Sequence, residues 1–339
     1  MEKNQKKNDV RKKNVSLKTI AFECGVSINT VSRALRDKSD ISDKTKSRVR
    51  QKAIELGYMP NHISQNLKTE ERLTVAVLIN SFDNLYYNLL CKVLINIFRK
   101  RGELEFVLLY SSTDSSFLTV NEIKQCVLQR IDLIVSHLLP TEEAIEFATL
   151  NKIYIVTVGS LDRCNRSDNV TIDNKMGCIM AARYLSNFHN NGRFLYVGIN
   201  YFNSDDRYNF FRQELIDGGD NDVIYFNTDK EDIFKLFEHI SNGYKSIFFY
   251  NDAVAYETLS KLDKLVINIR KMFLDLHLIG FDGLCESVYG LRQISTIKID
   301  FPKYAHATYS VIKHRLEYPN SSKQNLVLPV TLHQRVGIE

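Results

Sequence analysis

The sequence predicts two kinds of fold in one chain: a small all-α domain at the amino end and a larger α/β region built on parallel sheets. Three observations support this prediction. Residues 16–36 read as two short helices around a glycine-containing turn, apolar strands alternate with helices from Leu73 onward, and positive charge is concentrated before residue 70. With 339 residues, 44% of them hydrophobic, the chain is long enough to form more than one domain.

The amino-terminal helices carry start and stop signals at a helix-turn-helix spacing. Ser16 is a candidate N-cap, because its hydroxyl can accept a hydrogen bond from a free N–H group of the first turn. Gly25 suits a helix end that needs a left-handed residue, and Ser27 then caps a second helix. A third helix is expected to open at Ser42 and to end at Gly57.

The second helix has two different faces. Its apolar arc, expected to face the core, holds Val31, Ala34 and Leu35, and its polar, cationic arc holds Ile28, Asn29, Ser32, Arg33 and Arg36. An apolar side that faces the core and a cationic side that faces solvent are typical of the recognition helix of a helix-turn-helix, which lies in the DNA major groove. An ordinary amphipathic surface helix is the alternative.

The distribution of charge argues against that alternative. Residues 1–69 contain 16 Lys and Arg against 7 Asp and Glu, a net charge of +9, whereas residues 70–339 have a net charge of −4. The positive charge is therefore local to the predicted DNA-binding end, as expected of a part that displaces counterions from phosphates. Residues 1–15 form a basic tail, expected to be disordered, with a phosphate-contacting arm as the alternative reading.

Several classes of protein lack support in the sequence. No run of 18 apolar residues and no apolar leader occurs, so a cytoplasmic protein is expected. Six scattered cysteines without a C-x-x-C motif are interpreted as buried hydrophobic residues, and no cofactor or metal site is expected. The phosphate-binding and nucleophile motifs of α/β enzymes are missing, which makes an enzyme the rejected alternative.

The α/β region alternates strands with helices. The strand candidates are 74–79, 105–110, 133–136, 153–158, 194–197, 223–226, 246–250 and 277–279. Helical stretches between them include 86–101, 174–188, 206–217, 230–241 and 252–267. This alternation implies parallel sheets covered by helices on both faces, and about 260 residues are enough for two such units.

Polar residues follow three of these strands, in the clusters 80–84, Asn251-Asp252 and Asp282. In open parallel sheets the ligand crevice lies at the carboxyl ends of the strands, where carboxylates and amides can hold hydroxyls or amines. The alternative is that Asn251 or Asp252 caps the helix that begins at 252, and the two roles are compatible.

Over nearly its whole length the chain resembles the lac/gal repressor family (LacI/GalR-type) of bacterial transcription regulators. The resemblance is specific in residues 17–35 and continues through 41–45, 53–61 and 67–68 without a gap. Sparser, collinear matches follow at 84–87, 173–177, 182–185, 251–252, 280–282, 295–297 and 328–330. The chain departs from the family pattern where Phe210 replaces a glycine and where Leu85 and Arg292 replace prolines.

The resemblance implies a two-lobed, periplasmic-binding-protein-like sensor made of two doubly wound parallel sheets. The expected domains are a helix-turn-helix domain at 16–60, a hinge helix and linker at 61–72, and an effector-binding and dimerisation domain at 73–339. Lobe one is expected at about 73–160 and 295–320, and lobe two at about 161–290 and 325–335.

The family register also implies roles for single residues. Ile28, Asn29 and Arg33 would face base edges, while phosphates would be held by Ser16, Ser27, Thr30, Ser32 and Ser42. Leu67 would enter the minor groove as a wedge, and Asn61 and Lys68 complete the DNA-binding set. The expected effector-binding residues are Tyr86, Tyr87, Arg207, Asn251 and Asp282. For Arg207 the alternative is a salt bridge with Asp205 or Asp206.

The function implied is that of a sequence-specific repressor of carbohydrate-use genes, controlled by a small, sugar-like effector. No leucine heptad follows residue 335, so a homodimer on a pseudo-palindromic operator is expected, with no membrane partner. Control by a protein co-repressor that docks on the sensor is the alternative.

Overall fold

A computed structural model describes residues 16–35, 37–56, 73–79, 85–101, 104–110, 117–159, 166–188, 192–219, 221–265, 275–284 and 294–334. The chain divides into two compact units, residues 1–72 and 73–339, and each is described by itself. Within the described residues, no helix combines the length and the apolar character needed to cross a membrane.

The described residues of the first unit form three helices around a small core: α1 (Leu17–Cys24), α2 (Ile28–Leu35) and α3 (Asp43–Glu55). The predicted caps are confirmed. The backbone N–H of Thr19 donates to Ser16 Oγ at 3.3 Å, that of Thr30 to Ser27 Oγ at 3.0 Å, and Gly25 ends α1 in the left-handed region at φ 60°. The buried side chains are those of Ile20, Ala21, Cys24, Val31, Ala34, Val49 and Ala53.

The first sheet of the second unit has six strands in the order β13-β7-β6-β4-β1-β2, all parallel to their neighbours. Their bounds are β1 (Leu73–Ile79), β2 (Leu104–Tyr110), β4 (Leu133–Ser136), β6 (Tyr154–Val158), β7 (Asp168–Ile172) and β13 (Asn325–Leu328). A short pair, β3 (Phe117–Leu118) and β5 (Leu139–Pro140), lies outside it.

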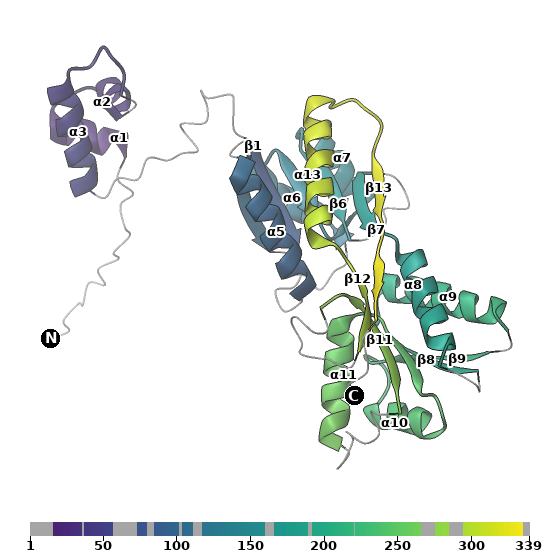
Figure 1. Ribbon diagram of the computed structural model, residues 1–339. Coiled ribbons are helices and arrows are strands. Elements are labelled where there is room, and N and C mark those ends of the chain that lie inside the picture. Colours follow the sequence, from purple (N-terminus) through teal and green to yellow (C-terminus); the bar gives the residue numbers. More distant parts are fainter. Residues whose placement is uncertain are drawn as a thin grey trace, which may run out of the picture. The chain divides into compact units, whose positions relative to one another are not determined.

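Helices cover both faces of this sheet, which explains why residues 75–79 of β1 are all apolar and buried. In β1, Val75, Val77 and Ile79 pack in the core that includes α5 (Leu85–Arg101) and α13 (Phe301–Glu317). Ala76 and Leu78 point the other way, into a core shared with α6 (Val120–Leu128) and α7 (Glu142–Leu150). Figure 1 shows α5 and α13, which contact each other, on the same side of the strands.

The second sheet has the order β14-β12-β11-β10-β8-β9, with β14 antiparallel and the others parallel. Its strands are β8 (Arg193–Gly198), β9 (Asp222–Asn227), β10 (Ser246–Phe249), β11 (His277–Asp282), β12 (Ser295–Lys298) and β14 (Thr331–His333). The helices are α8 (Asn174–Ser186), α9 (Phe202–Asp217), α10 (Ile233–Ser241) and α11 (Asp252–Leu265). Figure 1 shows α8 and α11 on opposite sides of this sheet.

The expected lobe boundaries are wrong at three strands. β7 and β13 pair with each other in the first sheet, although residues 161–290 and 325–335 were expected in lobe two. β12 pairs with β11 in the second sheet, although residue 295 was expected to begin a lobe-one segment. The chain therefore crosses between lobes three times, after β7, after β12 and after β13. The pairing of β7 with β13 joins residues 169 and 325, so local patterns do not reveal that these two strands share a sheet.

Local predictions agree with the structure more closely. All eight strand candidates correspond to strands, with ends shifted by at most a few residues, whereas α9 begins at Phe202 and not at residue 206. The described cysteines, Cys24, Cys91, Cys126 and Cys178, are free and buried. This matches their interpretation as small hydrophobic residues.

Candidate functional site

The recognition-helix candidate, α2, shows the division of faces that the sequence predicts. Val31 and Ala34 are fully buried, whereas Asn29 and Arg33 are exposed and Ile28 is 48% exposed. Thr30 and Ser32 are partly exposed at the edges of that surface. An isoleucine left half in solvent on a small domain is available for apolar contact with a partner.

The predicted phosphate-contacting serines are occupied as caps of their own helices. Ser16, Ser27 and Ser42 each accept a hydrogen bond from the backbone N–H of the threonine three residues later. The remaining free N–H groups at these helix starts point along the helix axis and favour anions. Serine at each of these positions therefore orders a helix start by capping it.

Ion pairs fix some of the basic side chains of this unit. Arg33 Nη2 lies 2.6 Å from Asp40 Oδ2, and this hydrogen bond lowers the pKa of the Asp40 carboxyl. Asp37 pairs with Arg50 at 2.9 Å and with Lys46 at 3.2 Å. Among the described residues, those that form no ion pair include Lys18, Lys44 and Arg48. Asn61, Leu67 and Lys68, the other predicted DNA contacts, lie outside the described residues.

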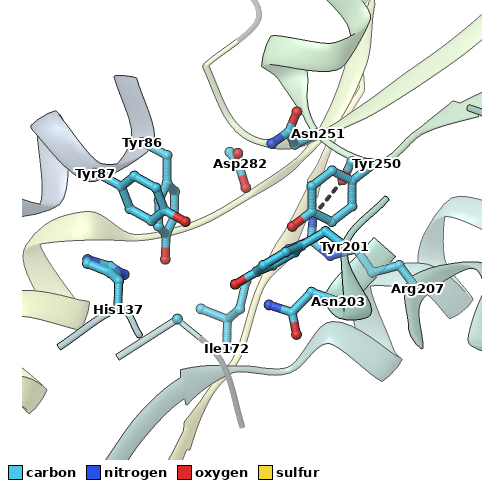
Figure 2. A pocket seen from close by; sticks show the side chains of 11 residues that line it. Tyr86, Tyr87, His137, Ile172, Tyr201, Asn203, Arg207, Tyr250, Asn251 and Asp282 are labelled. Carbon is cyan, nitrogen blue, oxygen red and sulfur yellow. Dashed lines mark hydrogen bonds between the residues drawn. The ribbon is translucent and has the colours of Figure 1, made fainter. Parts of the chain in front are cut away.

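In the second unit the five predicted effector residues line one pocket. It lies between the two sheets, with Tyr86 and Tyr87 on one side and Arg207, Asn251 and Asp282 on the other (Figure 2). The rest of its lining is His137, Gly159, Ile172, Tyr201, Asn203 and Tyr250.

Four of these six additional residues carry a sequence signal. His137, Gly159 and Tyr250 directly follow β4, β6 and β10, and Ile172 ends β7. They obey the same rule that selected Asp282, that ligands meet the carboxyl ends of parallel strands. Residue type alone does not mark them as ligand contacts, because glycine, isoleucine, tyrosine and a single histidine at a strand end are also common in protein cores.

Arg207 is anchored inside the protein and does not pair with Asp205 or Asp206, the alternative that the sequence offered. Its Nε donates to Asn174 Oδ1 at 2.8 Å and its Nη1 donates to the carbonyl of Tyr250. The guanidinium carbon also lies 3.6 Å from the centre of the Phe281 ring, a cation–π arrangement. These contacts fix the guanidinium at the pocket wall and consume part of its donor capacity.

Asp282 is a buried carboxylate held in an unfavourable backbone conformation. Its φ of 107° is outside the range that side chains normally adopt, and it is only 5% exposed. Burial raises the pKa of the Asp282 carboxyl well above its usual value, the charge of Arg207 opposes this effect, and Asp252 adds to it. Strain and burial at one residue are features of functional sites.

The turn after Asp282 is fixed by a hydrogen-bond network. Thr296 Oγ1 donates to Asp252 Oδ1 at 2.9 Å and accepts from the backbone N–H of Gly283 at 3.1 Å. Asp252 also accepts from the backbone N–H of Leu284. Asn251 caps α11 by accepting from the N–H of Val254 at 2.9 Å, so the capping alternative is confirmed for this residue, which also lines the pocket.

Aromatic rings fill most of the pocket. Tyr86 and Tyr87 contact each other and His137, with ring centres 4.5–6.0 Å apart, and Tyr201 faces Tyr250 at 6.5 Å. The cavity volume is about 40 Å³, well below the roughly 300–1,000 Å³ of pockets that hold small molecules. A ligand the size of a sugar therefore requires the rings or the lobes to move apart.

No group of three or more metal-ligating side chains is present within the described ranges. The chemistry that the pocket offers is hydrogen bonding by one guanidinium, one carboxylate, two amides, an imidazole and several phenols, together with aromatic stacking.

Known proteins resemble the first unit in particular and also the chain as a whole. Residues 16–61 match the family described as "Bacterial regulatory proteins, lacI family". The chain is 22% identical over 337 residues to "HTH-type transcriptional regulator MalR" of Clostridium butyricum, covering 95% of this chain and 98% of that protein.

Two solved structures share the fold of nearly the whole chain. A Lac repressor dimer bound to operator and an anti-inducer has a TM-score of 0.68 at 20% identity, with 95% of this chain and 98% of that chain covered. A complex of the transcriptional regulator CelR with cellobiose has a TM-score of 0.62 at 18% identity, with 95% and 99% covered.

A helix-turn-helix domain joined to a two-lobed α/β domain with a pocket between its sheets defines a transcription regulator, not an enzyme. The relatives to which the chain is similar carry the same description. Residues 16–61 match the lacI family of bacterial regulatory proteins, and over nearly its whole length the chain is similar to a transcription regulator.

Proposed function

We propose that this regulator is a repressor of carbohydrate-use genes, released from or held on its operator by a small sugar-like molecule in the pocket between the lobes. One observation carries the proposal. Tyr86 and Tyr87 face Arg207, Asn251 and Asp282 across a single pocket, so a ligand there contacts both lobes at once. The proposed site of action is the cytoplasm, where bacterial operator DNA lies.

Base recognition is assigned to Ile28, Asn29 and Arg33, which the exposed face of α2 supports. Asparagine can pair with adenine and arginine with guanine through two hydrogen bonds each, and every such pair is worth roughly 1–3 kcal/mol of discrimination. Ile28 offers only apolar contact, for example to a thymine methyl group.

Phosphate contacts are assigned to the helix starts at Ser16, Ser27 and Ser42 and to the hydroxyls of Thr30 and Ser32. The cap geometry supports this, since each capping serine leaves neighbouring backbone N–H groups free for an anion. The basic side chains Lys18, Lys44 and Arg48 add attraction that does not depend on DNA sequence.

The segment at 61–72 is proposed to act as the hinge, with Asn61 and Lys68 contacting DNA and Leu67 entering the minor groove as a wedge. Unstacking a base step costs about a few kcal/mol, which the contacts of bent DNA offset. Two copies related by a two-fold axis would read a pseudo-palindromic operator, as the Lac repressor dimer in complex with operator supports by analogy of fold.

Polyhydroxylated ligands fit the residue types in the pocket. Arg207, Asn251 and Asp282 supply donors and acceptors for hydroxyls, and Tyr86 or Tyr87 supplies a ring that can stack on a sugar face. The CelR complex with cellobiose supports this ligand class. Ligand binding would shift the equilibrium between lobe arrangements and so alter the distance between the two hinge segments of a dimer.

The test uses the full chain, an operator selected from random DNA, and fluorescence anisotropy with a panel of sugars. Asp282→Ala should bind the operator without ligand as tightly as the unaltered protein does, and it should lose the response to the sugar. Asp263→Ala, an exposed carboxylate on α11, is the matched control and should respond normally. A normal response of Asp282→Ala would place the effector site elsewhere or point to a protein co-repressor.

A further inference from the structure

His137 is a pocket residue that the proposed function leaves without a role. Its backbone is fixed, because its N–H donates to the carbonyl of Leu78 at 3.2 Å and the following N–H, of Leu138, donates to Ser136 Oγ at 3.0 Å. The side chain is only 4% exposed and is directed into the pocket beside the rings of Tyr86 and Tyr87 (Figure 2).

The two ring nitrogens of His137 have different environments. Nδ1 lies against the Val158–Gly159 peptide, since a Cβ added at Gly159 would be 3.1 Å from it. Burial lowers the pKa of the imidazole to about 3, and a hydrogen bond with the backbone of Val158 opposes that effect. The ring is therefore neutral at physiological pH, and we assign its single proton to Nδ1, which donates to the Val158 carbonyl.

Nε2 is then a lone-pair acceptor, and it has no hydrogen-bond partner among the described residues although it is buried. Buried acceptors are nearly always satisfied, so an unsatisfied one at a pocket wall indicates a missing donor. A neutral imidazole that accepts through Nε2 selects a ligand atom that bears a hydrogen.

Two further lining residues, Tyr86 and Asp282, also offer acceptors. Burial raises the pKa of the Tyr86 phenol well above its usual value and a hydrogen bond with Tyr304 raises it further, as expected if Tyr86 donates its proton to Tyr304. Tyr304 in turn donates to the carbonyl of Val170 at 2.9 Å. Asp282 contributes a carboxylate, while Arg207 uses Nε and Nη1 inside the protein.

The charges of the lining balance. Among the described residues of the lining, Arg207 is the cationic group, Asp282 is the acidic group and His137 is neutral. A phosphate or carboxylate group on the ligand would lie near the acidic Asp282, and the Arg207 guanidinium that could pair with it already donates to Asn174 and Tyr250. An ammonium group on the ligand would lie near the positive charge of Arg207. Burying an unpaired charge in such a site is costly, which favours an uncharged ligand.

Building on the proposed function, we propose that His137 is a specificity residue whose Nε2 accepts a hydrogen bond from a hydroxyl of an uncharged, hydroxyl-rich ligand. The pocket thereby distinguishes free sugars from phosphorylated or carboxylated ones and detects one particular hydroxyl.

The first experiment measures which compounds the full chain binds. Isothermal calorimetry is run with D-ribose, D-glucose and cellobiose, with D-ribose 5-phosphate and D-glucose 6-phosphate, and with D-glucosamine as a cation. Binding confined to one or more uncharged sugars is expected. Tighter binding of a phosphorylated or amino sugar than of its uncharged parent would overturn the proposal.

The second experiment compares His137→Phe, which keeps a ring and removes the acceptor, with His137→Asn, which restores an acceptor on a shorter side chain. His306→Gln, on the exposed side of α13, is the control. His137→Phe should lose about tenfold or more in affinity, since tenfold corresponds to about 1.4 kcal/mol, and His137→Asn should recover part of this. The unfolding temperature of ligand-free His137→Phe should not fall, because the variant removes an unsatisfied buried acceptor.

A series of deoxy analogues of the bound sugar, each lacking one hydroxyl, tests which hydroxyl donates to Nε2 of His137. This test does not depend on overall affinity. The unaltered protein should lose affinity for one deoxy analogue in particular, whereas His137→Phe should bind that analogue and its parent equally well. Equal losses in both proteins would overturn the assignment to His137. If the sugar binds as expected but leaves operator affinity unchanged, the control mechanism proposed above fails while the role of His137 stands.

Discussion

At the scale of single residues, the ion pair between Arg33 and Asp40 bears on the base-reading role proposed for Arg33. A guanidinium reads guanine with two N–H groups in a fixed fork, and a free arginine loses much rotamer freedom on doing so. Asp40 holds Nη2 at 2.6 Å while both side chains remain about half exposed. The remaining N–H groups are thus presented in a restricted orientation, and the carboxylate repels phosphates that approach the same place.

Substitutions at Arg33 and Asp40 should therefore affect specificity. Arg33→Ala should relax discrimination at one base pair by roughly 10- to 100-fold, the equivalent of about 1–3 kcal/mol. Asp40→Asn should reduce discrimination at the same base pair several-fold and increase affinity for random DNA, since it removes one negative charge. Anisotropy titrations against operators with single base changes measure both effects.

Ser32→Ala is the comparison for these variants, because loss of a phosphate contact should weaken all sites about equally. A uniform loss on every sequence for Arg33→Ala would show that this residue contacts phosphate and does not read a base. If Asp40→Asn leaves the discrimination unchanged, the ion pair with Asp40 has no role in orienting Arg33.

At the scale of elements, α8 supports the pocket through a close contact with β11. A Cβ added to Gly177 in α8 would lie 2.6 Å from the ring of Phe281, which is fully buried, and 3.1 Å from Ile297. Glycine is thus needed for helix and sheet to approach each other. Because Arg207 lies over the same Phe281 ring, the packing of α8 also positions a pocket residue.

Gly177→Ala should therefore destabilise the second unit and weaken ligand binding together. Overpacking of this kind costs about 1–3 kcal/mol, and the better helix propensity of alanine offsets at most about 1 kcal/mol. Calorimetric unfolding and ligand titration of the full chain measure the two effects. Met176→Ala, which changes a half-exposed neighbour on the same helix, should leave both unchanged. A stable Gly177→Ala variant would show that α8 can retreat from the sheet.

Most elements could be predicted from the sequence, because the information is local. The apolar run of β1 and the caps at Ser16 and Ser27 depend only on residues nearby in the chain. The pairing of β7 with β13 joins residues 169 and 325, and no local pattern specifies it. The same limit explains the incorrect lobe boundaries.

The pocket could be predicted in part for a related reason. Asn251 and Asp282 are polar residues directly after apolar strands, a pattern that predicts a ligand site. His137 also follows a strand, but a lone histidine is often a satisfied core residue, and only the structure shows that its Nε2 has no partner. Tyr201 and Asn203 follow β8 after a longer connection, which the strand-end pattern does not cover.

At the scale of the whole molecule, the second unit concentrates unfavourable buried groups in the pocket between its sheets. Three crossing segments join the two sheets. The pocket between the sheets contains His137, which is neutral and buried, and the buried carboxyl group of Asp282. Each group reduces stability in its own range of pH. Ligand binding that satisfies them would stabilise one arrangement of the lobes, which is the requirement for a binding-controlled switch.

The effect of His137 on stability has a defined sign. Its pKa is about 3 when folded and about 6.5 when unfolded. Above pH 6.5 the ring is neutral in both states, so stability does not depend on its titration. Between about pH 6.5 and 3 the unfolded chain binds a proton that the folded chain does not, so stability falls as pH falls, by about 1.4 kcal/mol per pH unit.

Asp282 acts in the opposite direction. Its pKa is raised on folding, so between 3.8 and the folded value the folded state retains a proton that the unfolded state releases, and stability falls as pH rises through that window. Urea unfolding of the full chain across pH 4–8 should therefore show a flatter acid limb for His137→Phe than for the unaltered protein. Asp282→Asn, which keeps a side chain tolerant of positive φ, should instead be more stable at neutral pH. Parallel pH profiles for all three proteins would mean that the pocket groups remain hydrated and titrate as they do in the unfolded chain.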